Sequence, residues 1–550
     1  MNGKSQRPWA VLTLNRIYQR FAFEPFFLEQ LEETADSGLS GAELRAGLYL
    51  LERQGQVSVV SKDYEEKRYC LPFMTFLEIK QSRPLPGIVP LEDQEVSLRT
   101  ESRPGLALDI FRALSFIAKG GLPLTSKGGI RQKAIQQLRK EIVLSDEDLL
   151  EFAQDPLNIK LPSSPAEMIL YLANTLGLAG RGPLQWQVLP AGLEAWLRCS
   201  WTEMEEQLLV KMLFVYPPAD TKLRHLAAAI LAPNIQEGAW YEVESFIHRL
   251  EKELGPCGAV RAAHKHWLHG WLRMLCGCGW LALGLTGEGG QAFRWIRKPK
   301  PSADLVPAVL DGRFYIQPDF EILIPPDVAW SVRWELEIVT EYVHFDNMTT
   351  YRLTREALQE AIICYGRTAT EIMAFLKKHA AAQLPVNVEL SIMEWAKEAD
   401  AECNCTHGGH QVPTFSGIEQ QKSEGLQSLK ISSRPSREDV IAAESNGWKE
   451  ELFPGIRNVP LSWTKELRGY HTSTARELLR QAMEWKTKVR FKLGESCPSI
   501  GRPTLLLTDG AEWKVQVLLD SEEKLDVASL QVAEWAPSEW EALQILLPEI

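Results

Sequence analysis

The length of the chain is the strongest constraint on its fold. A single hydrophobic core stops growing at about 250–300 residues, and this sequence has 550. At roughly 150 residues per domain, three to five units are expected. The content of 45% hydrophobic and 24% charged residues is typical of globular domains. Changes of pattern along the chain predict units at 1–100, 101–200, 201–300, 301–465 and 466–550.

The charge and the cysteine content exclude several classes of protein. A net charge of -12 disfavours a protein that coats nucleic acid over its whole surface, although local basic patches remain able to bind it. No stretch reaches the ~18 apolar residues of a membrane helix, and the first residues lack a signal-peptide core. Nine cysteines, an odd number, indicate free thiols. We therefore expect a cytoplasmic protein without a membrane partner.

The first unit has the pattern of a winged helix. Ser40 and Glu43 form a capping box at the start of a helix with leucines at helical spacing. An alternating strand at Val57 to Val60, a charged turn and a return strand at Tyr69 to Leu71 then predict the wing. The face of the helix expected to be exposed has mixed charge (Glu43, Arg45, Tyr49, Glu52 and Arg53), which favours packing or protein contact over DNA recognition.

The second unit contains a basic helix. Two amphipathic helices flank Gly120-Gly121, and Thr125-Ser126 are placed to cap the second one. No acidic residue occurs between Ser126 and Lys140, and the segment contains five cations: Lys127, Arg131, Lys133, Arg139 and Lys140. The helix is either a phosphate-binding site or an ordinary solvated face.

The third unit repeats the winged-helix pattern. Trp240 to Leu250 and His266 to Leu275 are predicted helices, and WLALGL, GEGG and QAFRWI predict a hairpin. Its second strand leads into Arg294, Arg297 and Lys298, with Trp295 among them. This segment either follows a phosphate backbone while the indole stacks on a base, or is a linker with solvated charges.

The segment RFYIQPDFEILIPPDVAW, from Arg313 to Trp330, predicts a strand with a sharp end. Phe320, Ile322 and Ile324 alternate as in a strand with one buried face, and Pro325-Pro326 stop it because proline donates no ladder hydrogen bond. A helix at Val328 to Ile338, a strand at Thr349 to Thr354 and further helices are predicted to follow.

The order IQPDFEILIPPD, TTYRLTREALQEAI and GRTATEIMAFLKKHAAAQLPVNVELSIMEW resembles the N-terminal domain of the XPB family of DNA repair and transcription helicases, and of bacterial helicase-associated proteins that contain this domain without a motor. The resemblance covers residues 311–463. It implies an α/β domain that engages DNA or docks a helicase or ATPase subunit. The preceding winged helices are similar to the arrangement in the TFIIH subunit that anchors XPB.

The last unit is similar to the WYL-type small barrel of bacterial regulators. A helix from TARELLRQAMEW and four or five short strands are predicted, with Trp513 at the position of the motif's Trp but Lys514 and Val515 in place of its Tyr and Leu. Residues 462–492 contain eight cations against three acids, and we select Lys486, Lys488 and Arg490 as candidate phosphate contacts. The fold class expected for the whole chain is multidomain α+β: winged-helix-type units, a central XPB N-terminal-like domain and a small β-barrel-like module.

Two motifs in the sequence bear on ATP hydrolysis and on metal binding. The only GKS, at Gly3 to Ser5, lacks the strand and the first glycine of a phosphate-binding loop. Cys403, Cys405, His407 and His410 are suitable zinc ligands, but their spacing is equally that of a flexible loop. We therefore expect no catalytic residue and no cofactor other than a possible zinc ion.

These observations favour a non-catalytic adaptor or DNA-binding protein that works with a helicase and binds DNA weakly. A winged-helix transcription regulator with a WYL-like sensing module and a subunit of a split helicase are the alternatives.

Because the phosphate-binding loop is missing, the purified protein should show no DNA-stimulated ATPase activity. The measurement is phosphate release with and without DNA. Robust turnover that disappears when a single lysine is changed to alanine would contradict this prediction.

Overall fold

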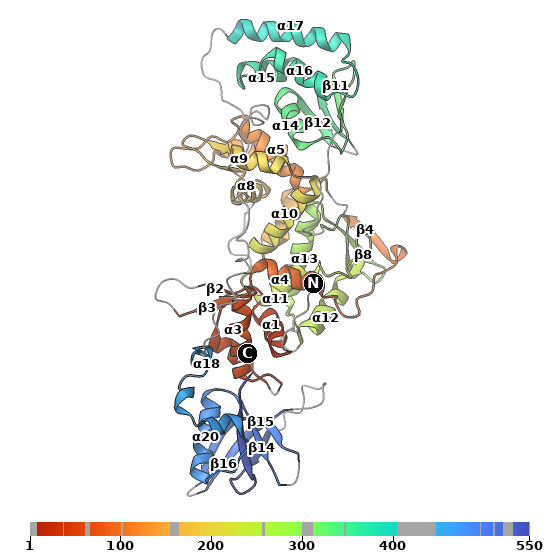
Figure 1. Cartoon of the computed structure of the whole chain (residues 1–550). Helices are drawn as coiled ribbons and strands as arrows, with labels where there is room; N and C mark the ends of the chain where they lie inside the picture. The colour runs from red at the N-terminus through yellow and green to blue at the C-terminus, as the bar shows by residue number, and fades with distance from the viewer. Residues whose placement is uncertain are drawn as a thin grey trace. The chain divides into compact units, whose positions relative to one another are not determined.

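The computed structural model describes residues 8–36, 38–60, 66–100, 103–153, 164–255, 259–299, 312–345, 348–403, 447–494, 497–509, 512–520 and 532–548. The chain divides into two compact units (Figure 1): unit 1 contains residues 1–82 and 431–550, and unit 2 contains residues 83–430. Many helices and several small antiparallel sheets are present, which confirms a multidomain α+β class.

The first segment of unit 1 has the predicted helix followed by the two predicted strands. The predicted capping box opens α3 (Gly41–Arg53): the Glu43 N–H donates to Ser40 Oγ at 3.3 Å, and the Ser40 N–H donates to Glu43 Oε2 at 2.7 Å. The three strands pair in the order β1-β3-β2. The other elements are α1 (Pro8–Phe21), β1 (Phe26–Phe27), α2 (Leu28–Glu32), β2 (Ser58–Val60), β3 (Arg68–Cys70) and α4 (Phe73–Ser82).

The second segment of unit 1 has short helices followed by a five-stranded antiparallel sheet of order β17-β16-β15-β14-β18. β17 and β18 are its edges, so the residues described here form an open sheet and show no barrel. The elements are α18 (Gly447–Leu452), α19 (Leu461–Lys465), α20 (Thr472–Glu484), β14 (Lys488–Lys492), β15 (Ser499–Asp509), β16 (Glu512–Leu519), β17 (Val532–Trp535) and β18 (Ala542–Leu546).

The two segments of unit 1 share one core. Ala42 and Ala46 of α3 are fully buried in a cluster with aromatic side chains of the second segment, among them Phe453 and Trp485. The Ala42 N–H donates to the Lys486 carbonyl at 3.1 Å. The predicted exposed face of α3 is therefore only partly exposed: Tyr49 packs on this cluster and Arg45 pairs with Glu32, whereas Arg53 faces solvent. Small side chains at Ala42 and Ala46 let the second segment pack directly on the helix.

Unit 2 begins with helices around a small sheet. α5 (Leu106–Ala118) is buried along most of its length. The predicted cap of the basic helix was wrong: α6 (Gln132–Glu141) begins after Arg131, and Thr125 Oγ1 instead accepts from the Gly129 N–H at 3.1 Å. The other elements are α7 (Asp146–Ala153), α8 (Pro165–Thr175), β5 (Ala179–Arg181), β6 (Trp186–Val188) and α9 (Pro190–Leu197).

The next part of unit 2 contains the predicted pair of helices and hairpin. Its sheet has the order β4-β8-β9-β7, so a strand from before α5 pairs with the hairpin. The elements are β4 (Val96–Thr100), α10 (Trp201–Val215), α11 (Thr221–Ala229), β7 (Tyr241–Glu242), α12 (Val243–Leu254), α13 (Ala262–Gly277), β8 (Leu281–Thr286) and β9 (Gln291–Trp295).

The last part of unit 2 is a four-stranded antiparallel sheet of order β10-β11-β13-β12 with helices packed on it. β11 is an inner strand, as the prediction of a central strand requires. The elements are β10 (Tyr315–Ile316), β11 (Glu321–Ile324), α14 (Trp330–Val339), β12 (Glu341–Phe345), β13 (Thr349–Arg352), α15 (Arg355–Ile363), α16 (Ala369–His379) and α17 (Val386–Cys403).

β10 and β11 form a hairpin, and the two prolines directly follow β11. Ile322 and Ile324 are fully buried, but Phe320, predicted in the same strand, lies in the turn at a φ of 69° and packs on Trp395. After the strand, the Pro325 carbonyl accepts from Arg333 Nη2 at 2.7 Å. The prolines thus end the backbone pairing of β11. The Pro325 carbonyl, which has no partner in the sheet, is bound by the Arg333 side chain of α14.

A buried ionic contact joins α5 to α14. Arg112 lies 3.6 Å from Glu337 Oε1 and 3.6 Å from the centre of the Tyr342 ring, and it also pairs with Glu141. The Tyr351 hydroxyl donates to Glu337 Oε1 at 2.7 Å. Because both ionised side chains are buried, separating the two helices would leave charges unpaired in a low-dielectric environment.

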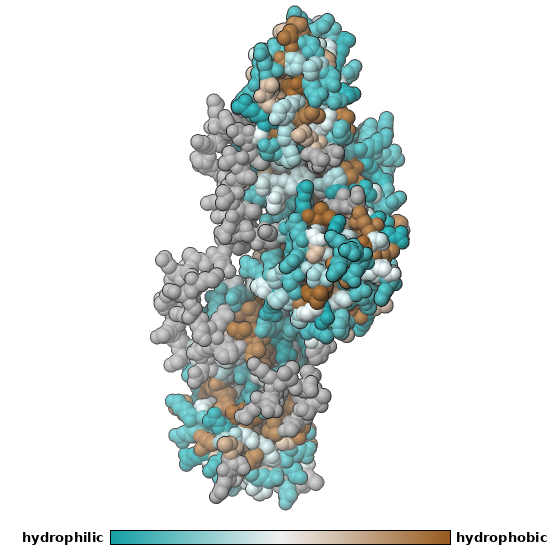
Figure 2. All heavy atoms as spheres, turned by 90° about the vertical axis from the view of Figure 1, so that its right-hand side faces the viewer, coloured by the Kyte–Doolittle hydropathy of each residue, from teal (hydrophilic) through white to brown (hydrophobic). Residues whose placement is uncertain are grey.

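No helix in the described residues is both long and apolar enough to cross a bilayer. Hydrophobic residues on the face in Figure 2 are interspersed with hydrophilic ones.

The burial of Ile322 gives a stability prediction. Ile322→Ala should lower the free energy of unfolding by ~2–4 kcal/mol, because it opens a cavity beneath an inner strand. Lys377→Ala removes only an exposed ion pair with Glu389 and should cost less than ~1 kcal/mol. The measurement is urea unfolding followed by tryptophan fluorescence. Equal, small losses in both variants would show that β11 is not part of the core.

Candidate nucleic-acid interface

The first predicted group of cations is exposed. Lys127 lies in the turn before α6, Arg131 directly precedes the helix, and Lys133 and Lys140 lie on one helix face, seven residues apart. The fifth member, Arg139, is paired with Asp146. All five side chains are exposed, and four of them form no ion pair within the described residues.

Backbone pairing brings another exposed cation to this region. An isolated bridge pairs Pro123 with Gln185, and another pairs Leu124 with Ile130. Since antiparallel neighbours place their turns at alternating ends, the turn 125–129 and the turn of the β5–β6 hairpin lie at the same end of this small sheet. Arg181, the last residue of β5, is exposed there.

We call these five residues the basic group: Lys127, Arg131, Lys133, Lys140 and Arg181. Within the described ranges, no carboxylate forms an ion pair with any of them. Ammonium and guanidinium groups without a partner suit the phosphates of a nucleic acid, to which they would contribute attraction that salt screens.

Lys298 and Arg294 of the second predicted group of cations form contacts within unit 2. Lys298 Nζ donates to the Ala232 and Ile235 carbonyls, both at 2.7 Å, and burial lowers the pKa of this ammonium to about 8. Arg294 lies over the Trp240 ring. The proposal that Trp295 stacks on a base was wrong, because its side chain is fully buried and its indole N–H donates to the Ile230 carbonyl at 2.9 Å.

Arg297 lines a small pocket with a buried carboxyl group. Glu205 Oε1 accepts from the Ala107 N–H in the first turn of α5 at 3.0 Å. Burial raises the pKa of Glu205 to about 8, and this bond, the Trp280 indole and the Arg297 guanidinium only partly offset the shift. Arg297 therefore stands beside a carboxyl group that is largely protonated at neutral pH.

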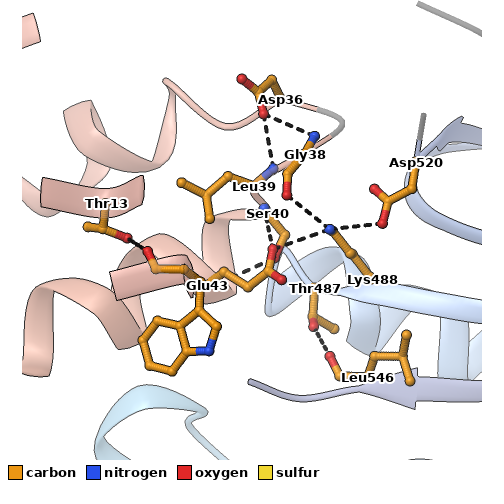
Figure 3. A network of polar contacts seen from close by, with 11 residues as sticks. Thr13, Asp36, Gly38, Leu39, Ser40, Glu43, Thr487, Lys488, Asp520 and Leu546 are labelled. Atoms are coloured by element: carbon orange, nitrogen blue, oxygen red, sulfur yellow. Dashed lines mark hydrogen bonds and ion pairs between the residues drawn. The ribbon is translucent and has the colours of Figure 1, made fainter. Parts of the chain in front are cut away.

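The third predicted group holds the two segments of unit 1 together (Figure 3). Lys488 Nζ lies 2.9 Å from Asp520 Oδ2 and 3.5 Å from Glu43 Oε2, and it donates to the Gly38 carbonyl at 3.2 Å. Lys486 pairs with Glu32 at 2.6 Å. Arg490 Nη1 donates to Gln544 Oε1 at 3.1 Å. In this structure the two lysines therefore bind carboxylates of their own unit.

Of the four predicted metal ligands, Cys403 alone lies within the described residues. Cys403 is the last residue of α17, and Cys405, His407 and His410 lie outside the described residues. Elsewhere in the described ranges, no group of three or more histidine, cysteine or acidic side chains could hold a metal ion.

Arg181 and the β5–β6 hairpin were not predicted from the sequence. The signal was the short sequence AGRGPLQWQV, in which Gly182-Pro183 between two short apolar runs is typical of a turn. The strands have only three residues each, so their pattern alone is weak evidence for a hairpin.

Comparison with known families identifies the end of unit 2. A family described as "Helicase conserved C-terminal domain" matches residues 314–399, which run from β10 into α17. The chain therefore contains a helicase-associated domain. The name of this family refers to a C-terminal helicase domain, whereas the sequence motifs of this segment resemble an N-terminal one, so the match does not decide between them. No curated protein matches the chain.

The buried carboxyl group predicts a dependence of stability on pH. Because the pKa of Glu205 is about 8 in the folded protein and 4.5 in its unperturbed state, the unfolded chain loses this proton first as pH rises between these values. Folding is thereby weakened by roughly 1.4 kcal/mol for each pH unit in this window.

Glu205→Gln should remove this loss, so that the difference in Tm between the variant and the wild type grows in favour of the variant from pH 5 to pH 8. Thermal unfolding at several pH values measures it, with Glu147→Gln, a surface carboxyl in α7, as the control. A difference independent of pH would show that Glu205 is ionised in the folded protein.

Proposed function

We propose that this protein is a non-catalytic, helicase-associated adaptor that binds DNA weakly and works with a helicase in DNA repair or transcription. The match of residues 314–399 to a helicase-domain family carries this proposal. The motif order in these residues supports an XPB-type N-terminal domain as the finer assignment, and the three segments of helices followed by a hairpin support winged-helix-type units ahead of it.

The contact between α5 and α14 supports a role for the preceding helices in placing this domain. Phe111 packs edge-on against Trp330, with ring centres 4.9 Å apart, beside the buried pair of Arg112 and Glu337. α5 also contacts α6, the helix of the basic group. A nucleic acid held by the basic group would then be linked through one packed helix to the domain that docks a helicase.

The transcription regulator remains the second candidate, with the five-stranded sheet of unit 1 as its WYL-like module. Such a protein would read bases with an exposed helix in the major groove. The buried contacts of Ala42 and Ala46 weigh against α3 as that helix. A subunit of a split helicase fits the family match as well as an adaptor does, and recovery of an ATPase in a pull-down of the native protein, followed by an activity assay, would separate the two.

DNA binding by the adaptor should depend on the basic group. Replacing Lys127, Lys133 and Lys140 together with Gln should flatten the log-log salt slope of the Kd by up to about three units, since each phosphate contact contributes about 0.9. Sequence preference should not change, because phosphate contacts do not read bases. Fluorescence titrations of single- and double-stranded oligonucleotides at several salt concentrations measure the slope.

The matched control replaces Lys377, Lys378 and Lys397 with Gln, which removes the same charge from exposed positions in the matched domain. Equal losses in both variants would indicate attraction by charge alone. No binding by the wild type at low salt would overturn the DNA-binding part of the proposed function.

A further inference from the structure

The turn of the β5–β6 hairpin exposes a leucine. Leu184 is 81% exposed, more than any other large hydrophobic side chain in the described ranges. A leucine with this exposure gains little from burial and contributes little to the stability of the fold. Its side chain is therefore available for contact with a ligand.

The backbone holds this leucine in place. The Gly182 N–H donates to the Gln185 carbonyl at 2.8 Å, which closes a turn with Pro183 and Leu184 at its centre. Pro183 restricts its own φ, and the Leu184 carbonyl accepts from the Leu124 N–H at 2.8 Å. A Cβ at Gly182 would lie 2.8 Å from the Gln185 carbonyl oxygen, so the tight turn requires glycine. Leu184 is thus presented on a rigid support.

Cations surround the tip of the hairpin. Arg181 is three residues before Leu184, and the turn with Lys127 ends at the same edge of the small sheet. Arg131 follows Ile130, the partner of Leu124 in that sheet. An apolar tip between cations matches nucleic acid, whose phosphates attract the cations while its base steps accept an apolar side chain.

We propose that Leu184 is a wedge that enters between bases of DNA held by the basic group, at a junction of double and single strand where the unstacking cost is lowest. This inference rests on the proposed DNA binding and adds two points: the kind of DNA that is bound and the side chain that enters between its bases. Apolar side chains of this kind unstack a base step at a cost of a few kcal/mol, which contacts to the flanking phosphates offset. The hairpin would then mark or hold open the junction at which a helicase acts.

The test uses the full-length protein and a forked duplex with 2-aminopurine at the junction, whose fluorescence rises when the base is unstacked. Wild type should raise the signal, Leu184→Ala should abolish most of the rise, and Leu184→Met, which keeps an apolar tip, should retain it. Leu461→Ala, a leucine exposed to 70% in unit 1, is the control and should behave as wild type. The Kd should change by less than about tenfold in Leu184→Ala, because lost contact and avoided unstacking oppose each other.

The outcomes separate this inference from the proposed function. DNA binding with a rise in fluorescence that Leu184→Ala leaves unchanged would overturn the wedge and keep the adaptor. Loss of a helicase partner in Leu184→Ala, with the rise intact, would assign the tip to protein contact instead. A wild-type protein that does not bind the fork at low salt would overturn both the wedge and the DNA-binding function.

Discussion

The fold of unit 1 depends on a buried carboxylate. Glu32, at the end of α2, is almost completely removed from solvent and binds Arg45 of α3 from one side and Lys486 of the second segment from the other. Glu32 and Arg45 are both largely buried, and removing one member of a buried ion pair typically costs about 3–5 kcal/mol, because the remaining charge stays desolvated. The Lys486 side chain is partly exposed, so its pair with Glu32 contributes less. Lys486 also has a φ of 53°, which is strained for a residue with a side chain. The ionic contact and the packing around Ala42 hold it in this conformation.

This contact changes how the charges of the chain are interpreted. In the sequence, the densest cations lie near the C-terminus, but Lys486 and Lys488 neutralise acids of the first segment. In unit 2, Lys298 satisfies backbone carbonyls. The basic group is less dense in sequence, yet its cations face water. Exposure without a partner, rather than local density, therefore distinguishes cations available to a ligand from those that stabilise the fold.

Structural features that depend on neighbouring residues in the sequence were predicted well. Contacts between residues far apart in the sequence were not predictable. The capping box at Ser40 and the break after Ile324 depend on residues within a few positions, and both were found as expected. The start of α6 was wrong because Thr125 has a nearer donor in Gly129, an alternative that competes with helix capping. The burial of Trp295 and the contact of Lys488 with Gly38 depend on residues 65 and 450 positions away, which no local pattern specifies.

The division of unit 1 between the two ends of the sequence has a consequence for synthesis. Unit 2 occupies residues 83–430, so the ribosome makes all of it between the two halves of unit 1. At about 5–20 residues per second, the first half waits roughly 20–70 s for its partner. During this delay the small buried face of α3 and the carboxylate of Glu32 are uncovered. The nascent chain therefore passes through a stage at which this surface of the first segment has no partner from the second segment.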